Sequence, residues 1–80
     1  MLKIMDINSF IENFAELLDD MDASALSPET KFRELDEWSS LSALGLMAMV
    51  DEEYDVDLKG EEIRKATTIE ELFNIISEKA

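Results

Sequence analysis

The 80-residue chain contains no cysteine and no histidine, and it has only one proline and two glycines. Without cysteine there is no disulfide framework and no thiolate ligand for zinc. Without histidine the commonest general base near neutral pH is missing as well. We therefore expect no metal site of the usual zinc type and no catalytic serine activated by histidine.

Positive charge is also scarce. The chain has 7 Lys and Arg residues and 20 Asp and Glu residues, which gives a formal net charge of −13. Such a chain repels nucleic-acid backbones and favours basic surfaces on partner proteins. A hydrophobic share of 46% and a charged share of 34% are typical of a globular domain. We expect a monomer with protein partners.

Long hydrophobic runs are missing too. No apolar stretch approaches the ~20 residues that a membrane span requires. The opening sequence MLKIMDINSF carries charges too early for a signal peptide. We expect no membrane span and a cytoplasmic location.

Apolar residues recur at helical spacing, which predicts an all-α fold formed by residues 1–80 as a single domain. We expect a small four-helix bundle: longer helices over residues 6–20, over residues 40–54 and within TTIEELFNIISEKA, and a short helix around GEEIRKA. The candidate N-terminal caps are Asp6 or the pair Ser9 and Glu12 for the first helix, and the pair Thr68 and Glu71 for the last.

The connection between the first two helices is long for a compact domain and contains Pro28, the only proline. Phe32 and Leu35 are the apolar residues that we expect to anchor it to the core. Gly60 separates the second helix from the short one.

The predicted second helix has two apolar faces when successive residues are placed about 100° apart. The first, which we assign to the core, comprises Ala43, Leu46, Met47, Val50 and Tyr54. The second comprises Leu41, Leu44, Gly45, Ala48 and Glu52. This second face either packs under the long connection or serves as a docking face for partner proteins.

Three serines begin this helix, in the sequence WSSLS. Ser39 suits the N-cap, and Ser42 points away from the predicted core face and is interpreted as solvated. Ser40 is left with its hydroxyl at the positive end of the helix, a position that suits a phosphate. Either Ser40 is acted upon by another protein, or the run is only a serine-rich helix start.

The run WSSLSALGLMAMVDEEYDVDL, followed by EEIRKATTIEELFNII, resembles the acyl and peptidyl carrier protein family over essentially the whole chain. The resemblance implies a carrier that is not an enzyme. It implies that Ser40 bears 4′-phosphopantetheine, transferred from coenzyme A by a separate transferase, and that Leu41 is the leucine of the family signature. An acyl or aminoacyl group would then be held as a thioester on the thiol of the cofactor.

Further expectations follow from the same resemblance. The partners would be a phosphopantetheinyl transferase and acyl- or aminoacyl-processing enzymes with basic docking patches, and fatty acid biosynthesis is one setting. The expected partner-binding residues are Leu41, Leu44, Gly45, Ala48, Asp51 and Glu52.

The chain departs from the family pattern at two positions. Ser39 stands where the family usually has aspartate, and both residues are good caps. Gly45 stands where fatty-acid carriers typically have an acidic residue used in partner contacts, and it costs about 1 kcal/mol of helix propensity. These departures, with Trp38 before the serines, favour a carrier of a specialised pathway.

Two alternatives remain at this point. The acids of DEEYDVDLKGEE follow the spacing of a calcium loop, but Val56 occupies the place of the glycine that makes its sharp turn. The second alternative is an unmodified adaptor of the same fold, which acts only as a protein-interaction module.

Overall fold

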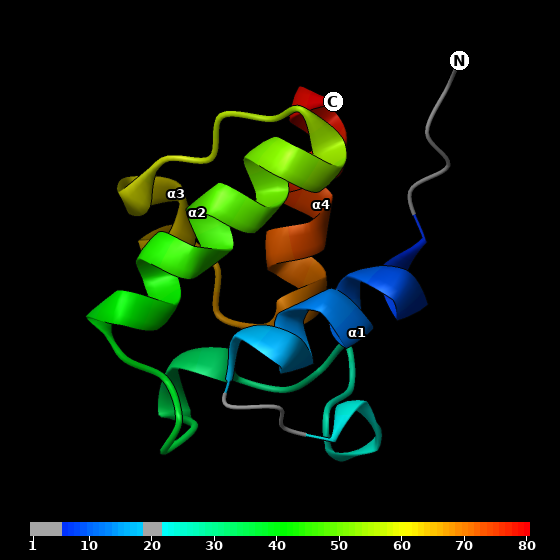
Figure 1. Ribbon diagram of the computed structural model, residues 1–80, viewed down its shortest axis with the longest axis vertical. Helices are drawn as coiled ribbons and strands as arrows, with labels where there is room; N and C mark the ends of the chain where they lie inside the picture. Colours follow the sequence, from blue (N-terminus) through cyan, green and yellow to red (C-terminus); the bar gives the residue numbers. More distant parts are fainter. Residues whose placement is uncertain (1–5, 19–21) are drawn as a thin grey trace.

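A computed structural model describes residues 6–18 and 22–80, and every regular element within them is helical. Four α-helices follow one another: α1 (Ile7–Leu17), α2 (Ser40–Tyr54), α3 (Gly60–Lys65) and α4 (Ile69–Lys79). Helices α1, α2 and α4 pack around a common core, and α3 lies against α2 and α4 (Figure 1). The predicted all-α bundle of three longer helices and one short helix is confirmed.

Helix α1 begins after Asp6, whose carboxylate accepts from the Asn8 N–H at 3.2 Å. Asp6 is therefore the cap, and the alternative of Ser9 with Glu12 is wrong: the Ser9 hydroxyl donates to the Asp6 carboxylate at 3.4 Å. The helix ends at Leu17, which is earlier than predicted. The last part of the predicted range, residues 19–20, lies outside the described residues.

An aromatic cluster packs where α1 meets the long connection. Phe10, Phe14 and Phe32 are fully buried, and the ring of Trp38 lies 5.9 Å from that of Phe14 and 5.0 Å from that of Phe32. Such ring pairs contribute roughly 0.5–1.5 kcal/mol beyond the area that they bury. The predicted anchoring of the long connection is confirmed, because Phe32 is fully buried and the half-buried Leu35 packs against the core.

The long connection contains two short 3₁₀ turns, η1 (Ala23–Ala25) and η2 (Phe32–Glu34). It runs across the N-terminal end of α4, where the Ile69 N–H donates to the Thr30 carbonyl at 3.1 Å and the Glu70 N–H to the Pro28 carbonyl at 2.9 Å. These bonds satisfy N–H groups that the first turn of a helix leaves without partners. The connection is therefore part of the packed structure.

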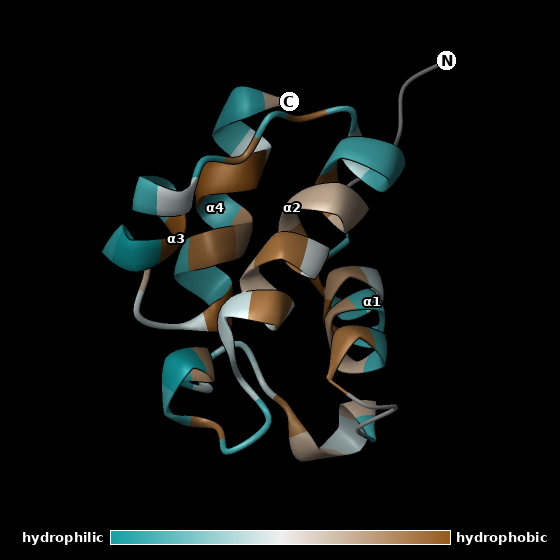
Figure 2. Cartoon of the chain, turned by 60° about the vertical axis from the view of Figure 1, so that its left-hand side comes forward, coloured by the Kyte–Doolittle hydropathy of each residue, from teal (hydrophilic) through white to brown (hydrophobic). Residues whose placement is uncertain are grey.

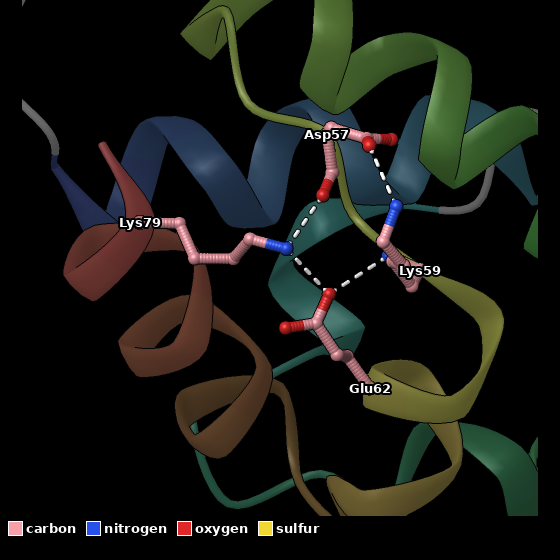
Figure 3. Close-up of polar contacts among 4 residues, drawn as sticks. All are labelled: Asp57, Lys59, Glu62 and Lys79. Atoms are coloured by element: carbon pink, nitrogen blue, oxygen red, sulfur yellow. Dashed lines mark hydrogen bonds and ion pairs between the residues drawn. The ribbon is translucent and has the colours of Figure 1, made fainter.

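Lys79 of α4 ties the α2–α3 connection to α3, and Lys59 forms an ion pair within the connection (Figure 3). The Lys79 ammonium donates to the Asp57 carbonyl and to the Glu62 carboxylate, each at 2.6 Å, and the Lys59 ammonium lies 2.8 Å from the Asp57 carboxylate. The hydrogen bond from Lys79 holds the pKa of Glu62 below its ordinary value, and that from Lys59 does the same for the pKa of Asp57. The C-terminal turn of α4 thereby fixes the start of α3.

The N-terminal cap of α4 agrees in part with the prediction. The Thr68 hydroxyl accepts from the Glu71 N–H at 3.2 Å, as a cap should. The Glu71 carboxylate accepts from the Thr67 N–H at 2.6 Å, one residue before the N–H expected for a capping box. Gly60 is the first residue of α3 rather than a separate linker.

Candidate functional site: the first turn of helix α2

Ser39 and Ser42 cap helix α2, because the hydroxyl of each accepts a hydrogen bond from the backbone N–H of the other. The Ser39 hydroxyl accepts from the Ser42 N–H at 3.4 Å, and the Ser42 hydroxyl accepts from the Ser39 N–H at 3.2 Å. The predicted N-cap is confirmed. The pair leaves the two residues between them, Ser40 and Leu41, outside the capping interactions.

The prediction of a solvated Ser42 is wrong. Its side chain is buried, with 8% of the residue exposed, and its hydroxyl donates to the Glu37 carbonyl at 3.3 Å. The reason is that the end of the long connection folds back along the first turn of α2. Helical phase alone places a residue relative to the other helices and says nothing of such a loop.

Ser40 is the first residue of α2 and is exposed. Within the described part of the chain its hydroxyl makes no hydrogen bond that would hold it against the protein. A phosphate ester on this oxygen would lie at the positive end of the helix dipole, which favours negative charge. The residues present therefore fit a phosphate-linked group at Ser40.

The buried face of α2 differs in phase from the predicted one. Leu46 and Val50 are buried as expected, but Met49 is buried too, whereas Met47 and Tyr54 are only half-buried. Ala43 is also only half-buried. The core face is thus rotated towards Ser42 and Met49, and at Ser42 the end of the connection covers the helix through the Glu37 carbonyl.

The predicted outer face of α2 is apolar and open to solvent. Leu41 is 77% exposed and Leu44 is 61% exposed, and Ala48 and Glu52 are exposed as well. Gly45 differs from the others in being half-buried, beside Leu17 of α1. The alternative in which this face packs under the long connection is therefore wrong for Leu41 and Leu44.

Charge on α2 is confined to its C-terminal end. The first eleven residues, SLSALGLMAMV, are uncharged, and Asp51 and Glu52 follow them on the exposed surface. Figure 2 shows the same division, with the hydrophilic residues of α2 gathered at its C-terminal turn. The site therefore combines an apolar surface beside Ser40 with an acidic end that begins about three turns after Ser40 along the helix.

The acids of the calcium-like segment are used in other ways. Asp51 lies in the final turn of α2, and Asp55 follows the helix as a left-handed C-cap with a φ of 55°. Asp57 and Glu62 bind lysines. Among residues 6–18 and 22–80, no group of three or more acidic side chains is placed to hold a metal ion. The segment is a helix end and a connection rather than a calcium loop.

No helix within the described residues is long and apolar enough to cross a membrane. The fold and the first turn of α2 define a class of protein: a small acidic helical domain with an exposed serine hydroxyl beside an apolar surface. Comparison with known sequences identifies the family.

Residues 8–76 match the family described as the phosphopantetheine attachment site. An acyl carrier protein of Picosynechococcus sp. is 38% identical over 60 residues, which cover 75% of this chain and 74% of the relative. An acyl carrier protein of Rubrobacter xylanophilus is 31% identical over 77 residues, which cover 92% of this chain and 95% of the relative. No solved structure gives a significant match.

The chain belongs to the acyl and peptidyl carrier protein family. It is a carrier and not an enzyme, and its prosthetic group is 4′-phosphopantetheine. The thiol that a carrier needs comes with this group, which agrees with a chain that has no cysteine of its own.

Proposed function

We propose that Ser40 is the attachment residue and that the chain carries acyl or aminoacyl intermediates as thioesters between the enzymes of a pathway. The observation that carries this proposal is the pairing of Ser39 with Ser42, which leaves the exposed Ser40 hydroxyl uncommitted at the start of α2. Of the three serines, Ser40 alone combines exposure with a free hydroxyl within the described residues.

Each residue of the first turn has a separate part in this proposal. Ser40 supplies the oxygen that becomes esterified to the phosphate of the prosthetic group, while Ser39 and Ser42 hold the turn in helical geometry. The positive end of α2 stabilises the charge of the phosphodiester. The prosthetic group, once bound, supplies the thiol that holds the cargo.

The outer face of α2 is the surface on which we place the partner enzymes. Leu41, Leu44 and Ala48 would form the apolar centre of the contact, with Gly45 at its edge, and Asp51 and Glu52 would attract basic residues of the partner. Apolar contacts of this kind hold a complex together, whereas charges at the rim mainly set the rate of association and the choice of partner.

We further propose that the chain acts as a monomer in the cytoplasm, where it serves a phosphopantetheinyl transferase and acyl-processing enzymes. Its net charge of −13 opposes association with a second copy. The relatives that it resembles are acyl carrier proteins, which supports lipid and fatty-acid chemistry as its setting.

The test is modification in vitro with coenzyme A and a broad-specificity phosphopantetheinyl transferase, followed by intact mass spectrometry. We expect one prosthetic group on the wild type and on Ser39→Ala, and none on Ser40→Ala. The Ser42→Ala variant is a matched control, because it removes a hydroxyl two residues away. A folded wild type that stays unmodified would instead support the adaptor alternative.

The same measurement on protein purified from its own host would identify the cargo. A thioester-bound group adds its own mass to that of the prosthetic group and is released by hydroxylamine. An unmodified mass in the host, under conditions in which Ser40 is accessible, would contradict the carrier function.

A further inference from the structure

A surface pocket opens where the connection between α1 and α2 meets the connection between α3 and α4. Its volume is ≈ 280 Å³. It is lined by Lys31, Arg33 and Glu34, which belong to η2 or directly precede it, and by Thr67, which lies between α3 and α4. We call it the η2 pocket. It gathers two of the chain's 7 Lys and Arg residues on a protein with a net charge of −13.

Arg33 is held in place at this pocket by two contacts. Its Nη2 group donates to the Ala66 carbonyl at 2.7 Å, next to Thr67 in the chain. The guanidinium carbon also lies 5.8 Å from the centre of the Phe32 ring, within the range of a cation–π interaction. A guanidinium has five N–H donors, and among the described residues Arg33 makes only the bond to Ala66. Its remaining donors are therefore available at a fixed position.

Neither cation of the pocket is neutralised by an acid. No ion pair of the described residues involves Lys31 or Arg33, although Glu34 lines the same pocket. The carboxylate of Glu71 accepts from the Thr67 N–H at 2.6 Å. Acids farther away are screened beyond about 8 Å at physiological salt. The pocket therefore keeps an excess of positive charge.

A phosphate group is the ligand that these donors suit. A guanidinium binds phosphate through parallel hydrogen bonds, and an ammonium adds a point charge. A phosphate monoester presents three acceptor oxygens and about 1.5–2 negative charges near pH 7. A carboxylate presents two oxygens and one charge, so it satisfies fewer of the donors. A cationic ligand is excluded by the two positive side chains.

The volume of the pocket bears on the source of the phosphate. An apolar cavity of about 150 Å³ holds one benzene ring, and the η2 pocket is nearly twice as large. It therefore has room for a phosphate together with a small organic group that carries it. Inorganic phosphate shares the chemistry but fills less of the volume.

We propose that the η2 pocket binds the phosphate group of a small phosphate monoester, with the Arg33 guanidinium as its fixed donor and Lys31 as a second positive charge. The site is separate from Ser40, which does not line the pocket. Because the lining comes from two connections, a bound phosphate stabilises the contact between them and hence the folded state.

The test is a titration of the full ¹⁵N-labelled chain with glycerol 2-phosphate, observed by NMR at an ionic strength held constant with sodium chloride. We expect saturable shifts of the backbone N–H signals of Lys31, Arg33, Glu34 and Thr67, and none with glycerol alone. Inorganic phosphate should shift the same signals but bind at least threefold more weakly. Tighter binding of inorganic phosphate would contradict the monoester. Shifts spread over the whole chain, or equal shifts with sodium chloride alone, would overturn the site.

Variants assign the donors. Arg33→Lys keeps the charge but loses the fork of donors, and should raise the dissociation constant for glycerol 2-phosphate at least fivefold. Lys31→Met breaks no ion pair of the described residues and should raise it at least threefold. Lys59→Met is the matched control, because it removes an equal charge from an exposed side chain that does not line the pocket, and its dissociation constant should stay within twofold of the wild type. Unchanged binding by folded Arg33→Lys and Lys31→Met proteins, or equal weakening in Lys59→Met, would refute the proposal.

A last comparison separates this pocket from the attachment serine. Ser40→Ala, and the wild type bearing its prosthetic group, should both bind glycerol 2-phosphate as the unmodified wild type does, because Ser40 does not line the pocket. Loss of binding on attachment of the prosthetic group would assign the pocket to the phosphodiester of that group and overturn a separate ligand. Modification of Ser40 without phosphate binding would refute only the η2 pocket. Phosphate binding without modification of Ser40 would refute only the proposed attachment site.

Discussion

Ser42 Oγ lies 3.2 Å from the backbone nitrogen of Ser39 and 3.3 Å from the carbonyl oxygen of Glu37, so one buried hydroxyl joins α2 to the connection before it. We predict that Ser42→Ala destabilises the fold by about 1–2 kcal/mol, as loss of a helix cap does. Ser40→Ala should change the stability by less than about 0.5 kcal/mol, as is usual for exposed positions. Urea unfolding of both variants is the measurement, and equal stabilities would contradict the role given to Ser42.

The second prediction separates docking from folding on α2. Leu41→Ala should leave the stability within about 0.5 kcal/mol of the wild type because Leu41 is 77% exposed. Leu46→Ala, the matched truncation on the buried face, should cost about 2–5 kcal/mol. Leu41→Ala should also raise the dissociation rate from the transferase, measured by surface plasmon resonance. A loss of several kcal/mol in Leu41→Ala would place that leucine in the core.

The third prediction concerns Lys79. Replacing it with methionine removes the ammonium from Glu62 and from the Asp57 carbonyl, and should cost about 0.5–1 kcal/mol at pH 7. Lys31→Met is the control for charge, because it changes the net charge by the same amount. The Lys31 side chain is exposed and takes part in none of the ion pairs of the described residues. Chemical unfolding of both variants at pH 7 is the first measurement.

The pH dependence of the Lys79→Met effect follows from the lowered pKa of Glu62, which the Lys79 hydrogen bond causes. A carboxyl whose pKa is lowered in the folded state stabilises the fold above its ordinary value, here 4.5, and loses that contribution as the pH falls through the lowered value. The difference between wild type and Lys79→Met should therefore shrink in acid below the ordinary value. A difference that is constant from pH 7 to acid would contradict this account.

The fourth prediction follows from the net charge of −13. Mutual repulsion of this size weakens the fold at low ionic strength, so added salt should raise the melting temperature. Magnesium at millimolar concentration should act in the same direction and more strongly per mole, measured by calorimetry. Stoichiometric binding of calcium at micromolar concentration, with no substitution by magnesium, would contradict the absence of a calcium loop.

The amphipathic pattern and the caps predicted the four helices and the place of Ser40 at the start of α2, because helix periodicity and N-terminal capping depend on residues close in sequence. The buried state of Ser42 and the phase of Met49 were not predictable in this way. The first depends on the connection lying against the first turn of α2, where the Glu37 carbonyl accepts from the Ser42 hydroxyl. The contact joins segments whose pairing no local pattern encodes.

The surroundings of Gly45 were not predictable for a similar reason. Gly45 stood out in the sequence as an unfavourable helix residue, which signals a packing or docking role. Its neighbour Leu17 belongs to another helix, so only the tertiary structure brings the two residues together.

The carbonyls of Pro28 and Thr30 that accept from the N-terminus of α4 have a consequence for folding. The N–H groups of Ile69 and Glu70 bond to these carbonyls only when a segment about forty residues earlier has taken its place, so the start of α4 and the connection stabilise each other. Amide hydrogen exchange at Ile69 and Glu70 should therefore proceed only through global unfolding, as in the core. Proteolytic cleavage of the connection between Pro28 and Thr30 should unfold the whole domain rather than release a loop.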